Sequence, residues 1–462
     1  MNNGLISSEI RLTCRRFMKL SEMSALLRDI GVSPVKSLGQ NFLHDRNLSR
    51  WIVDQANLAA DDYVVEVGPG LGALTALALA HGAHVLAIEK DKRLAQFLRE
   101  QFPQKNLEIV HDDALAFDTR SLFTQPRVKF LGNLPYYISS QLLIRFLEYP
   151  SPICLWVLML QKELARRIEA SPGSSDYGAL TLQIQLHYRV EYLRSVSANV
   201  FLPKPDVDSA LIRITPRGKD ELGRCNSTVF RKLVRRGFSQ RRKQLGKLIR
   251  EEASNWEEIA EELGISQRVR GEELSLEQWI ALTNLVAPIA ENHADNAGEE
   301  QFQVVDERDR PKGAAGRSLV HANNLLHRAV HVLIFNPAGE VFLQFRSASK
   351  DRHPLKWDSS AAGHVNAGED YDHAAARELA EELGIDAPLH RMAKLPASEQ
   401  TGQEFIWIYE STYNGEMQLN ASEIEAGRLF RPETVDQWIQ ARPNEFATGF
   451  LECWKAWREK NA

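Results

Sequence analysis

The segment Asn133-Leu134-Pro135-Tyr136 carries the groups that an adenine amino group needs to become a nucleophile. The lone pair of adenine N6 is delocalised into the ring, so the nitrogen reacts poorly until acceptors bind both of its N–H donors. The Asn133 side-chain oxygen and the Leu134 carbonyl are suitable acceptors. Pro135 fixes the backbone, and Tyr136 offers a ring on which an extruded base can stack. We predict that these residues are catalytic; an ordinary turn after a strand is the structural alternative.

A glycine-rich turn lies upstream, in the string YVVEVGPGLG at 63–72. Gly68 and Gly70 let the chain turn tightly after a strand and let its backbone approach a ligand. Glu89 ends the next predicted strand, where an acid reaches ribose hydroxyls in Rossmann-type folds. Asp113 ends the third strand, where a carboxylate can accept from an adenine amino group. The sequence therefore predicts a nucleotide-like cofactor; for Glu89, a helix N-cap is the structural alternative.

A third chemical motif lies far downstream, at 363–385. Glu378, Glu381 and Glu382 have the spacing that places them on one face of a helix. Converging carboxylates suit Mg²⁺ or Mn²⁺, and such an ion can bridge phosphate oxygens and help to activate water. We predict that the three glutamates bind metal, that Glu378 and Glu382 are catalytic, and that Arg377 orients the cluster. A solvated acidic helix is the structural alternative.

The elements that must position these residues are those of two α/β units. Strands and helices alternate between residues 60 and 170, which predicts a parallel sheet covered on both faces, with ligands at the carboxyl ends of the strands. The string HRAVHVLIFNPAGEVFLQFRS predicts a hairpin with NPAG as its turn. We divide the chain into an α/β domain (1–215, with a loosely ordered start at 1–20), a small helical domain (216–290), a polar linker (291–302) and a second α/β domain (303–462).

The composition is that of a globular protein without a membrane partner. The 462 residues are 44% hydrophobic and 25% charged, and no apolar run reaches the roughly 20 residues of a membrane span. We see no secretory signal, and four scattered cysteines fit a reducing cytoplasm. The net charge of −5 hides a stretch, 231–250, with nine cations and no acid. Such a stretch can bind RNA phosphates, although a solvated helix face is the alternative.

Residues 33–290 resemble the ribosomal-RNA adenine N6-dimethyltransferases, most closely the 16S small-subunit members. The strings that carry the resemblance include LGQNFLHD (38–45), GNLPYY (132–137), FLPKPDVDSALIRI (201–214) and FSQRRKQL (238–245). It implies a Rossmann-like methyltransferase that places two methyl groups on each of two adjacent adenines near the 3′ end of 16S rRNA in the small ribosomal subunit, and no partner chain. It also implies that S-adenosylmethionine is bound by Asn41, Leu43, Gly68, Glu89, Asp113 and Asn133.

Two alternatives stay open for this half. The family also contains enzymes that act on large-subunit rRNA, and the KPDVDSA and FSQRRK strings favour the small-subunit branch. A ribosome-assembly or transcription-type binding factor is the non-enzymatic alternative, which turnover of S-adenosylmethionine would exclude.

Residues 301–462 resemble the Nudix hydrolases, since the fixed positions of the Nudix pattern are present from Gly363 to Gly384. The resemblance implies an α/β/α domain that hydrolyses a diphosphate-linked small molecule with divalent metal. The surrounding strings resemble the branch that contains the isopentenyl-diphosphate isomerases. Those enzymes use a cysteine where this chain has Ala362, and they hold metal with histidines and glutamates. His327, His364 and Glu404 match parts of that set, while His321 is one residue out of register.

We therefore expect a bifunctional enzyme. Isomerase-like chemistry and a non-catalytic binding module are the alternatives for the C-terminal domain. Glu423 and Glu425 are further candidates for a base or metal ligand there, or surface residues.

Overall fold

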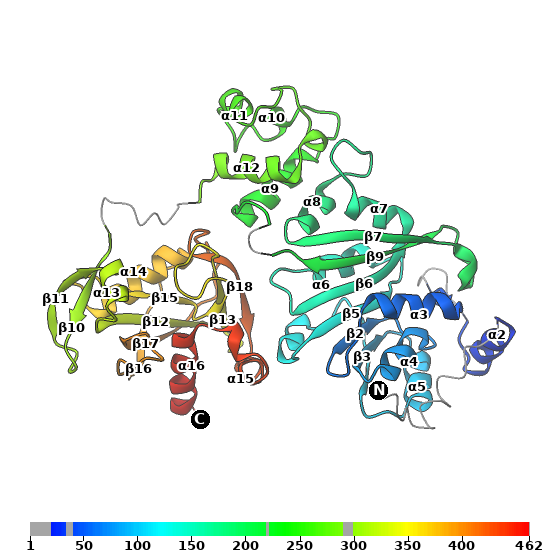
Figure 1. Ribbon diagram of the computed structural model, residues 1–462, viewed down its shortest axis with the longest axis horizontal. Coiled ribbons are helices and arrows are strands. Elements are labelled where there is room, and N and C mark those ends of the chain that lie inside the picture. The colour runs from blue at the N-terminus through cyan, green and yellow to red at the C-terminus, as the bar shows by residue number, and fades with distance from the viewer. Residues whose placement is uncertain (1–19, 34–39, 219–220, 290–298, 462) are drawn as a thin grey trace, which may run out of the picture. The chain divides into compact units, whose positions relative to one another are not determined.

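The computed structural model describes residues 20–33, 40–218, 221–289 and 299–461, and it contains two compact units (Figure 1). The first comprises the chain up to Val286 apart from Cys225–Ser227, and the second comprises those three residues and 287–462. The predicted extension at 1–19 and most of the predicted linker, 291–298, lie outside the described residues.

A seven-stranded sheet forms the centre of the first unit. Its strands, in spatial order, are β4 (Leu107–His111), β3 (His84–Glu89), β2 (Tyr63–Val67), β5 (Val128–Asn133), β6 (Ile153–Gln161), β9 (Ser209–Pro216) and β7 (Tyr188–Val196). The first five are parallel, as predicted, but β9 runs antiparallel to both β6 and β7. The prediction covered only the strands up to β6, so the antiparallel edge formed by β9 and β7 was not predicted. The segment between β7 and β9 has no crossover helix, which a parallel return would need.

Helices cover both faces of this sheet because adjacent strand residues point to opposite sides. Val64 packs in a core with Ile52, whereas Val65 packs in another with Phe146. The helices of the first core are α3 (Arg46–Gln55), α4 (Ala73–Ala80) and α5 (Lys92–Gln101); those of the second are α6 (Ser139–Phe146), α7 (Lys162–Glu169) and α8 (Ala179–Gln185). Beside them lie α2 (Leu20–Asp29) and the short pair β1 (Phe42–Leu43) and β8 (Phe201–Leu202).

A group of helices follows β9. It consists of α9 (Ser227–Gly237), α10 (Leu245–Leu248), α11 (Trp256–Glu262) and α12 (Leu276–Val286). Phe230, Leu233 and Val234 bury one face of α9, and Trp279 of α12 is fully buried. Close packing against this ring excludes a side chain at Gly237, where a β-carbon would lie 2.5 Å from Trp279. Of the nine cations at 231–250, all but Arg236 are exposed.

The second unit is built on a nine-stranded sheet centred on β12 (His327–Phe335). This strand is parallel to β17 (Glu404–Thr412) and antiparallel to β13 (Val341–Arg346) and β15 (Ala361–His364). The pair β12–β13 is the predicted hairpin. The other strands are β10 (Gln301–Val305), β11 (Pro311–Gly316), β14 (Trp357–Asp358), β16 (His390–Leu395) and β18 (Ile424–Phe430).

Helices lie on both sides of this second sheet, which makes an α/β/α arrangement (Figure 1). Buried residues of α14 (Tyr371–Leu383), such as Ala375 and Leu379, share a core with Val330 and Val332 of β12. The remaining helices are α13 (Arg317–Ala322), α15 (Pro432–Ala441) and α16 (Thr448–Lys460). No helix in the described part of the chain has the length and apolarity that a membrane span requires.

A buried ion pair joins β5 to the start of β2. Lys129 Nζ lies 2.6 Å from Asp62 Oδ2, and both side chains are buried. The same ammonium donates to the carbonyls of Ala56 and Asn57 after α3. The pair therefore fixes the loop between α3 and β2 to the sheet.

Replacing Lys129 with methionine is expected to lower the free energy of unfolding by about 3–5 kcal/mol, because it leaves the Asp62 carboxylate buried without its cation. Arg127 lies 3.4 Å from the other carboxylate oxygen, but its side chain is exposed and is a poor substitute. Urea unfolding followed by tryptophan fluorescence measures the change. The double variant K129M/D62N should recover part of the loss. A loss below about 1 kcal/mol for K129M would contradict the assignment.

Candidate active sites

A cavity of about 470 Å³ opens at the carboxyl ends of β2, β3, β4 and β5. This is the place predicted from the alternation of strands and helices. The predicted residues that line it are Asn41, Gly68, Gly70, Glu89, Asp113, Asn133 and Pro135.

Asn133, the last residue of β5, is held by the segment before β1. Its Nδ2 donates to the Asn41 carbonyl oxygen at 2.8 Å. Because the amide nitrogen is used in this bond, Oδ1 is the atom that can accept from a ligand. The next residue, Leu134, has a buried side chain and an amide that donates to the Met159 carbonyl at 3.1 Å. The backbone that carries Asn133 is therefore bound to β6.

Glu89 projects into the same cavity from the end of β3. Its carboxylate accepts from the Gly70 amide at 3.2 Å and the Asp91 amide at 2.9 Å. Burial, partly offset by these bonds, raises the pKa of Glu89 to about 7. The chain can approach so closely because Gly70 has φ +59° and because a β-carbon there would lie 2.9 Å from the Phe42 ring.

Binding of S-adenosylmethionine is expected to weaken about tenfold between pH 8 and pH 6, since a group with a pKa near 7 passes from mostly ionised to mostly protonated over this range. The protonated Glu89 loses an acceptor for the ribose hydroxyls, so affinity falls as the pH falls. Calorimetric titration at both pH values measures the change. Glu89→Gln should bind weakly at both. Glu66, whose pKa burial also raises to about 7, is the control: Glu66→Gln should keep the pH dependence. Equal affinity of the unmodified protein at both pH values would contradict the role of Glu89.

Asp113 is paired with a neighbouring lysine. Its Oδ2 lies 2.7 Å from Lys90 Nζ, and its Oδ1 accepts from the Leu115 amide at 2.9 Å. The hydrogen bond from Lys90 lowers the pKa of Asp113. Lys90 is exposed, so a ligand that donates to Asp113 can displace it at little cost.

Three predicted residues, Leu43, Leu134 and Tyr136, do not line this cavity. The side chain of Leu43 is buried in the core beside α3, and its neighbour Phe42 lines the cavity instead. The Tyr136 hydroxyl lies 2.5 Å from Ser209 Oγ, whereas Tyr137 lines the cavity and is 46% exposed. The stacking role of Tyr136 stays a prediction, and Tyr137 is a second candidate ring.

A larger cavity, of about 830 Å³, lies in the second unit. The predicted residues among its lining are Glu378, Glu381, Glu382, His321, His364, Glu404 and Glu423, together with Ala362. Glu425 does not appear among the described residues of this lining.

The three predicted glutamates differ in their surroundings, although all project from α14. Glu382 is 2% exposed and accepts from Gln344 Nε2 and the Ala362 amide, each at 3.1 Å. Glu378 packs against Gly363, where a β-carbon would lie 2.0 Å from its carboxyl. Glu381 has 55% of its side chain exposed. Burial and the neighbouring carboxylate of Glu382 raise the pKa of Glu378 to about 8. Burial also raises the pKa of Glu382. Two buried carboxyls that resist ionisation side by side suit a cation between them.

Arg377 holds this arrangement. Its NH1 donates to Glu378 at 2.7 Å and to Glu381 at 3.0 Å, and its NH2 donates to the His364 carbonyl at 2.9 Å. Glu369 accepts from the same guanidinium on two oxygens. The carboxylates are thus oriented by the protein itself.

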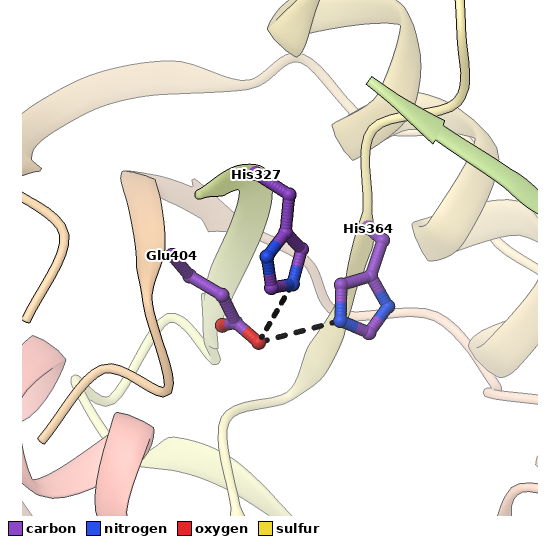
Figure 2. A group of neighbouring side chains, drawn as sticks. All are labelled: His327, His364 and Glu404. Carbon is purple, nitrogen blue, oxygen red and sulfur yellow. Dashed lines mark hydrogen bonds and ion pairs between the residues drawn. The ribbon is translucent and has the colours of Figure 1, made fainter. Parts of the chain in front are cut away.

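A second polar cluster lies at the other end of β15 (Figure 2). Oε1 of Glu404 lies 3.5 Å from His327 Nε2 and 3.3 Å from His364 Nε2. Burial opposes the ionisation of Glu404, but the two histidines outweigh it and hold its pKa well below the usual range. Phe302 stacks on His364 with ring centroids 4.0 Å apart. Both ring nitrogens of His321, whose centroid lies 5.4 Å from that of His364, have no hydrogen-bond partner among the described residues.

These side chains fit a divalent metal ion. One ligand atom from each of His327, His364 and Glu404 lies within 4.8 Å of the others, and a set of imidazoles with one carboxylate suits zinc, manganese or iron. Ala362, which donates to Glu382, and His364 are two positions apart on β15, so these two backbone positions are about 7 Å apart along the strand. The two clusters share no ligand residue, and both contribute to the lining of the same cavity.

The model of the ribosomal RNA adenine dimethylase family matches residues 33–288, more than half of the chain. The chain belongs to the ribosomal RNA adenine dimethylase family. A ribosomal RNA small subunit methyltransferase A from Chlorobium phaeobacteroides is 39% identical over 254 residues, which are 55% of this chain and 94% of that protein. A dimethyladenosine transferase structure from Plasmodium falciparum is 26% identical over 52% of this chain and 95% of that chain, with a TM-score of 0.46.

A second model, that of the NUDIX domain, matches residues 325–448. The structure of DR0079 from Deinococcus radiodurans is 27% identical over 35% of this chain and all of that chain, with a TM-score of 0.31. The chain is an enzyme that joins an adenine dimethylase to a NUDIX domain.

Sequence reasoning missed several residues of both cavities. In the dimethylase unit these are Phe42, Lys90 and Tyr137; in the NUDIX domain they are Gln344, Arg346, Lys350 and Arg352. The alternation of side chains along β13 could have revealed two of them, because it sets Gln344 and Arg346 on the opposite face of the strand from Phe345.

Proposed function

We propose that the first unit transfers methyl groups from S-adenosylmethionine to N6 of two adjacent adenines near the 3′ end of small-subunit 16S rRNA. The observation that carries this proposal is the orientation of Asn133, whose amide nitrogen is bound to Asn41 and whose oxygen can accept from the adenine amino group. The N6 lone pair forms a bond to the methyl carbon while the carbon–sulfur bond breaks. The electron pair of that bond stays on sulfur, and the N6 proton passes to water.

The charge of the helical segment supports an RNA substrate. Arg235, Arg242, Lys243, Lys247 and Arg250 are exposed, and none of them makes an ion pair among the described residues. Other cations of the stretch are paired, as Arg236 is with Glu251 and Glu252. Free cations can neutralise several phosphates and release their counterions. A ribosomal RNA substrate would put this activity in the cytoplasm.

The test is methyl transfer from labelled S-adenosylmethionine to unmethylated small subunits, with large subunits as the second substrate. We expect dimethyladenosine at two adjacent positions of 16S rRNA. Labelling of large-subunit rRNA alone would favour the large-subunit branch, and tight RNA binding without turnover would favour a binding factor.

We propose that the NUDIX domain hydrolyses a diphosphate-linked small molecule with Mg²⁺ or Mn²⁺. The convergence of Glu378 and Glu382, with Glu381 at the rim, supports this activity. The metal would be held by these carboxylates and would neutralise the phosphate oxygens. Water forms a bond to one phosphorus while the bridging P–O bond breaks, and its electron pair stays on the leaving phosphate. Glu378 accepts the proton of the attacking water.

Isomerase-like chemistry is the second candidate, and the cluster of His327, His364 and Glu404 favours it. The side chain at 362 opposes it, because alanine cannot carry a proton. No cysteine occurs among the described residues of the cavity lining, and Cys453 is fully buried.

Phosphate release by the full chain from ADP and from inorganic pyrophosphate tests the proposal, with Mg²⁺, with Mn²⁺ and with chelator. We expect release that needs the metal. Isomerisation of isopentenyl diphosphate without phosphate release would establish the second candidate, and binding without reaction would indicate a non-catalytic module.

A further inference from the structure

The lining of the larger cavity contains no large aliphatic residue and no Phe, Tyr or Trp among the described residues. The described lining residues are charged, hydroxyl-bearing, amide-bearing, imidazole-bearing or small, and the only apolar residue types among them are Ala329, Ala362, Ala447 and three glycines. Nucleobases are usually bound by aromatic and apolar side chains. Prenyl chains bind because their apolar surface is buried against apolar residues. This surface instead offers hydrogen bonds and charge.

One pair of cations lies beside the metal-binding carboxylates. Lys350 forms an ion pair with Glu423, and its side chain is only 10% exposed. Arg346 lies 3.0 Å from Asp358 and is similarly buried. Buried cations beside a metal site can hold the outer phosphate of a diphosphate, because phosphate oxygens replace the carboxylate partners.

A second pair of cations, Arg317 and Arg352, lies around Asp351. Arg317 NH2 lies 2.9 Å from Asp351 Oδ1, and the Arg352 amide donates to the same oxygen at 2.8 Å. The Arg352 guanidinium makes no hydrogen bond or ion pair within the described part of the chain. It lies against Gly402, where a β-carbon would be 2.9 Å from its NH1 and 3.6 Å from Glu404. This guanidinium therefore lies at the part of the lining that includes Gly402 and Glu404.

Neutral polar groups complete the lining. Ser318, Ser349, Thr448 and Asn420 line the cavity, and Thr448 Oγ1 lies 3.3 Å from His353 Nε2. Hydroxyl and amide groups that both donate and accept match the hydroxyls of a polyol.

We propose that the substrate of the NUDIX domain is a small polyol, such as a sugar, that carries a diphosphate and a separate phosphate ester. The inference rests on the proposed hydrolase activity and names its substrate class. Lys350 and Arg346 hold the diphosphate beside the glutamates, and Arg352 binds the separate phosphate. Water attacks one phosphorus of the diphosphate and the P–O–P bridge breaks. The products are inorganic phosphate and a polyol with two phosphate monoesters.

The test compares phosphate release by the full chain with Mg²⁺ from four probes: 5-phosphoribosyl 1-diphosphate, ADP, isopentenyl diphosphate and inorganic pyrophosphate. We expect kcat/KM for the sugar diphosphate to exceed that for ADP and isopentenyl diphosphate by about tenfold or more, one lost phosphate contact being worth about that much. Phosphorus NMR should show ribose 1,5-bisphosphate as the product, whereas release of pyrophosphate would contradict cleavage of the bridge.

A variant pair tests the phosphate subsite. Arg352→Ala should raise KM for the sugar diphosphate about tenfold more than KM for pyrophosphate. Pyrophosphate carries no separate phosphate ester that Arg352 could bind. Arg310→Ala, which removes an exposed cation paired with Asp306 outside the cavity, should change neither.

The failures are distinguishable. Preference for ADP or isopentenyl diphosphate, or an equal effect of Arg352→Ala on both probes, overturns the substrate class and leaves the hydrolase intact. No metal-dependent release from any probe overturns both proposals.

Discussion

Asn133→Ala is expected to reduce methyl transfer about 100- to 1000-fold, which is the usual effect of removing one oriented polar group that acts on the reacting atom. The side-chain oxygen of Asn133 is the acceptor that draws the adenine amino group toward a reactive geometry. Its orientation comes from the bond between Nδ2 and the Asn41 carbonyl. S-adenosylmethionine affinity should fall only about fivefold, since binding loses a single hydrogen bond. Single-turnover methylation and calorimetric titration separate the two quantities.

A matched control is available in the turn before β4. Asn106 Nδ2 donates to the Ala83 carbonyl at 2.7 Å, away from the cavity. Asn106→Ala should lose comparable stability and keep its rate of methyl transfer. If Asn133→Ala retained full activity, or if both variants lost activity in parallel, the bond from Asn133 would be structural and the proposed mechanism would be wrong.

Glu382→Gln is expected to reduce diphosphate hydrolysis about 100-fold or more. Oε2 of Glu382 already accepts from Gln344 and the Ala362 amide. A glutamine must therefore keep its oxygen toward those donors and turn its amide nitrogen toward the metal. The variant loses a charge and a ligand atom while the helix keeps its packing. Steady-state phosphate release with Mg²⁺ measures the effect.

The exposed glutamates give a graded comparison. Glu381 is half exposed and paired with Arg377, so Glu381→Gln should cost less than about tenfold. Glu416 is exposed outside the cavity, and Glu416→Gln should have no effect. Equal losses for Glu381→Gln and Glu382→Gln would argue against the central place of Glu382.

The sequence predicted the parts of the fold in which a pattern of residues or elements repeats at a regular spacing. The alternation of strands and helices predicted β2 to β6, and helical spacing predicted one face for Glu378, Glu381 and Glu382. The antiparallel edge was not predicted, because β7 reads YRVEYLRSV, in which charged residues recur on the exposed side of an edge strand. Pairing partners of such a strand depend on contacts far along the chain rather than on its own residues.

Side-chain direction was the harder quantity to predict. Tyr136 and Tyr137 are the same residue type in adjacent positions, and only the fold places one beside Ser209 and the other in the cavity. The same holds for Phe42 and Leu43, which are adjacent on β1 and face opposite ways. His327, His364 and Glu404 were selected by resemblance alone, because they come from three separate strands whose pairing the sequence does not state.

Strand β15 is only four residues long, yet it contacts both polar clusters of the NUDIX domain. The amide of Ala362 donates to Glu382, and the ring of His364 faces Glu404. Any shift of β15 that an ion at one cluster causes is therefore felt at the other cluster. An ion at the histidine cluster then changes the metal affinity of the glutamate cluster by some factor. Thermodynamic reciprocity requires that an ion at the glutamate cluster change the metal affinity of the histidine cluster by the same factor. The metal requirement of one cluster therefore has to be measured with the ion at the other cluster held fixed.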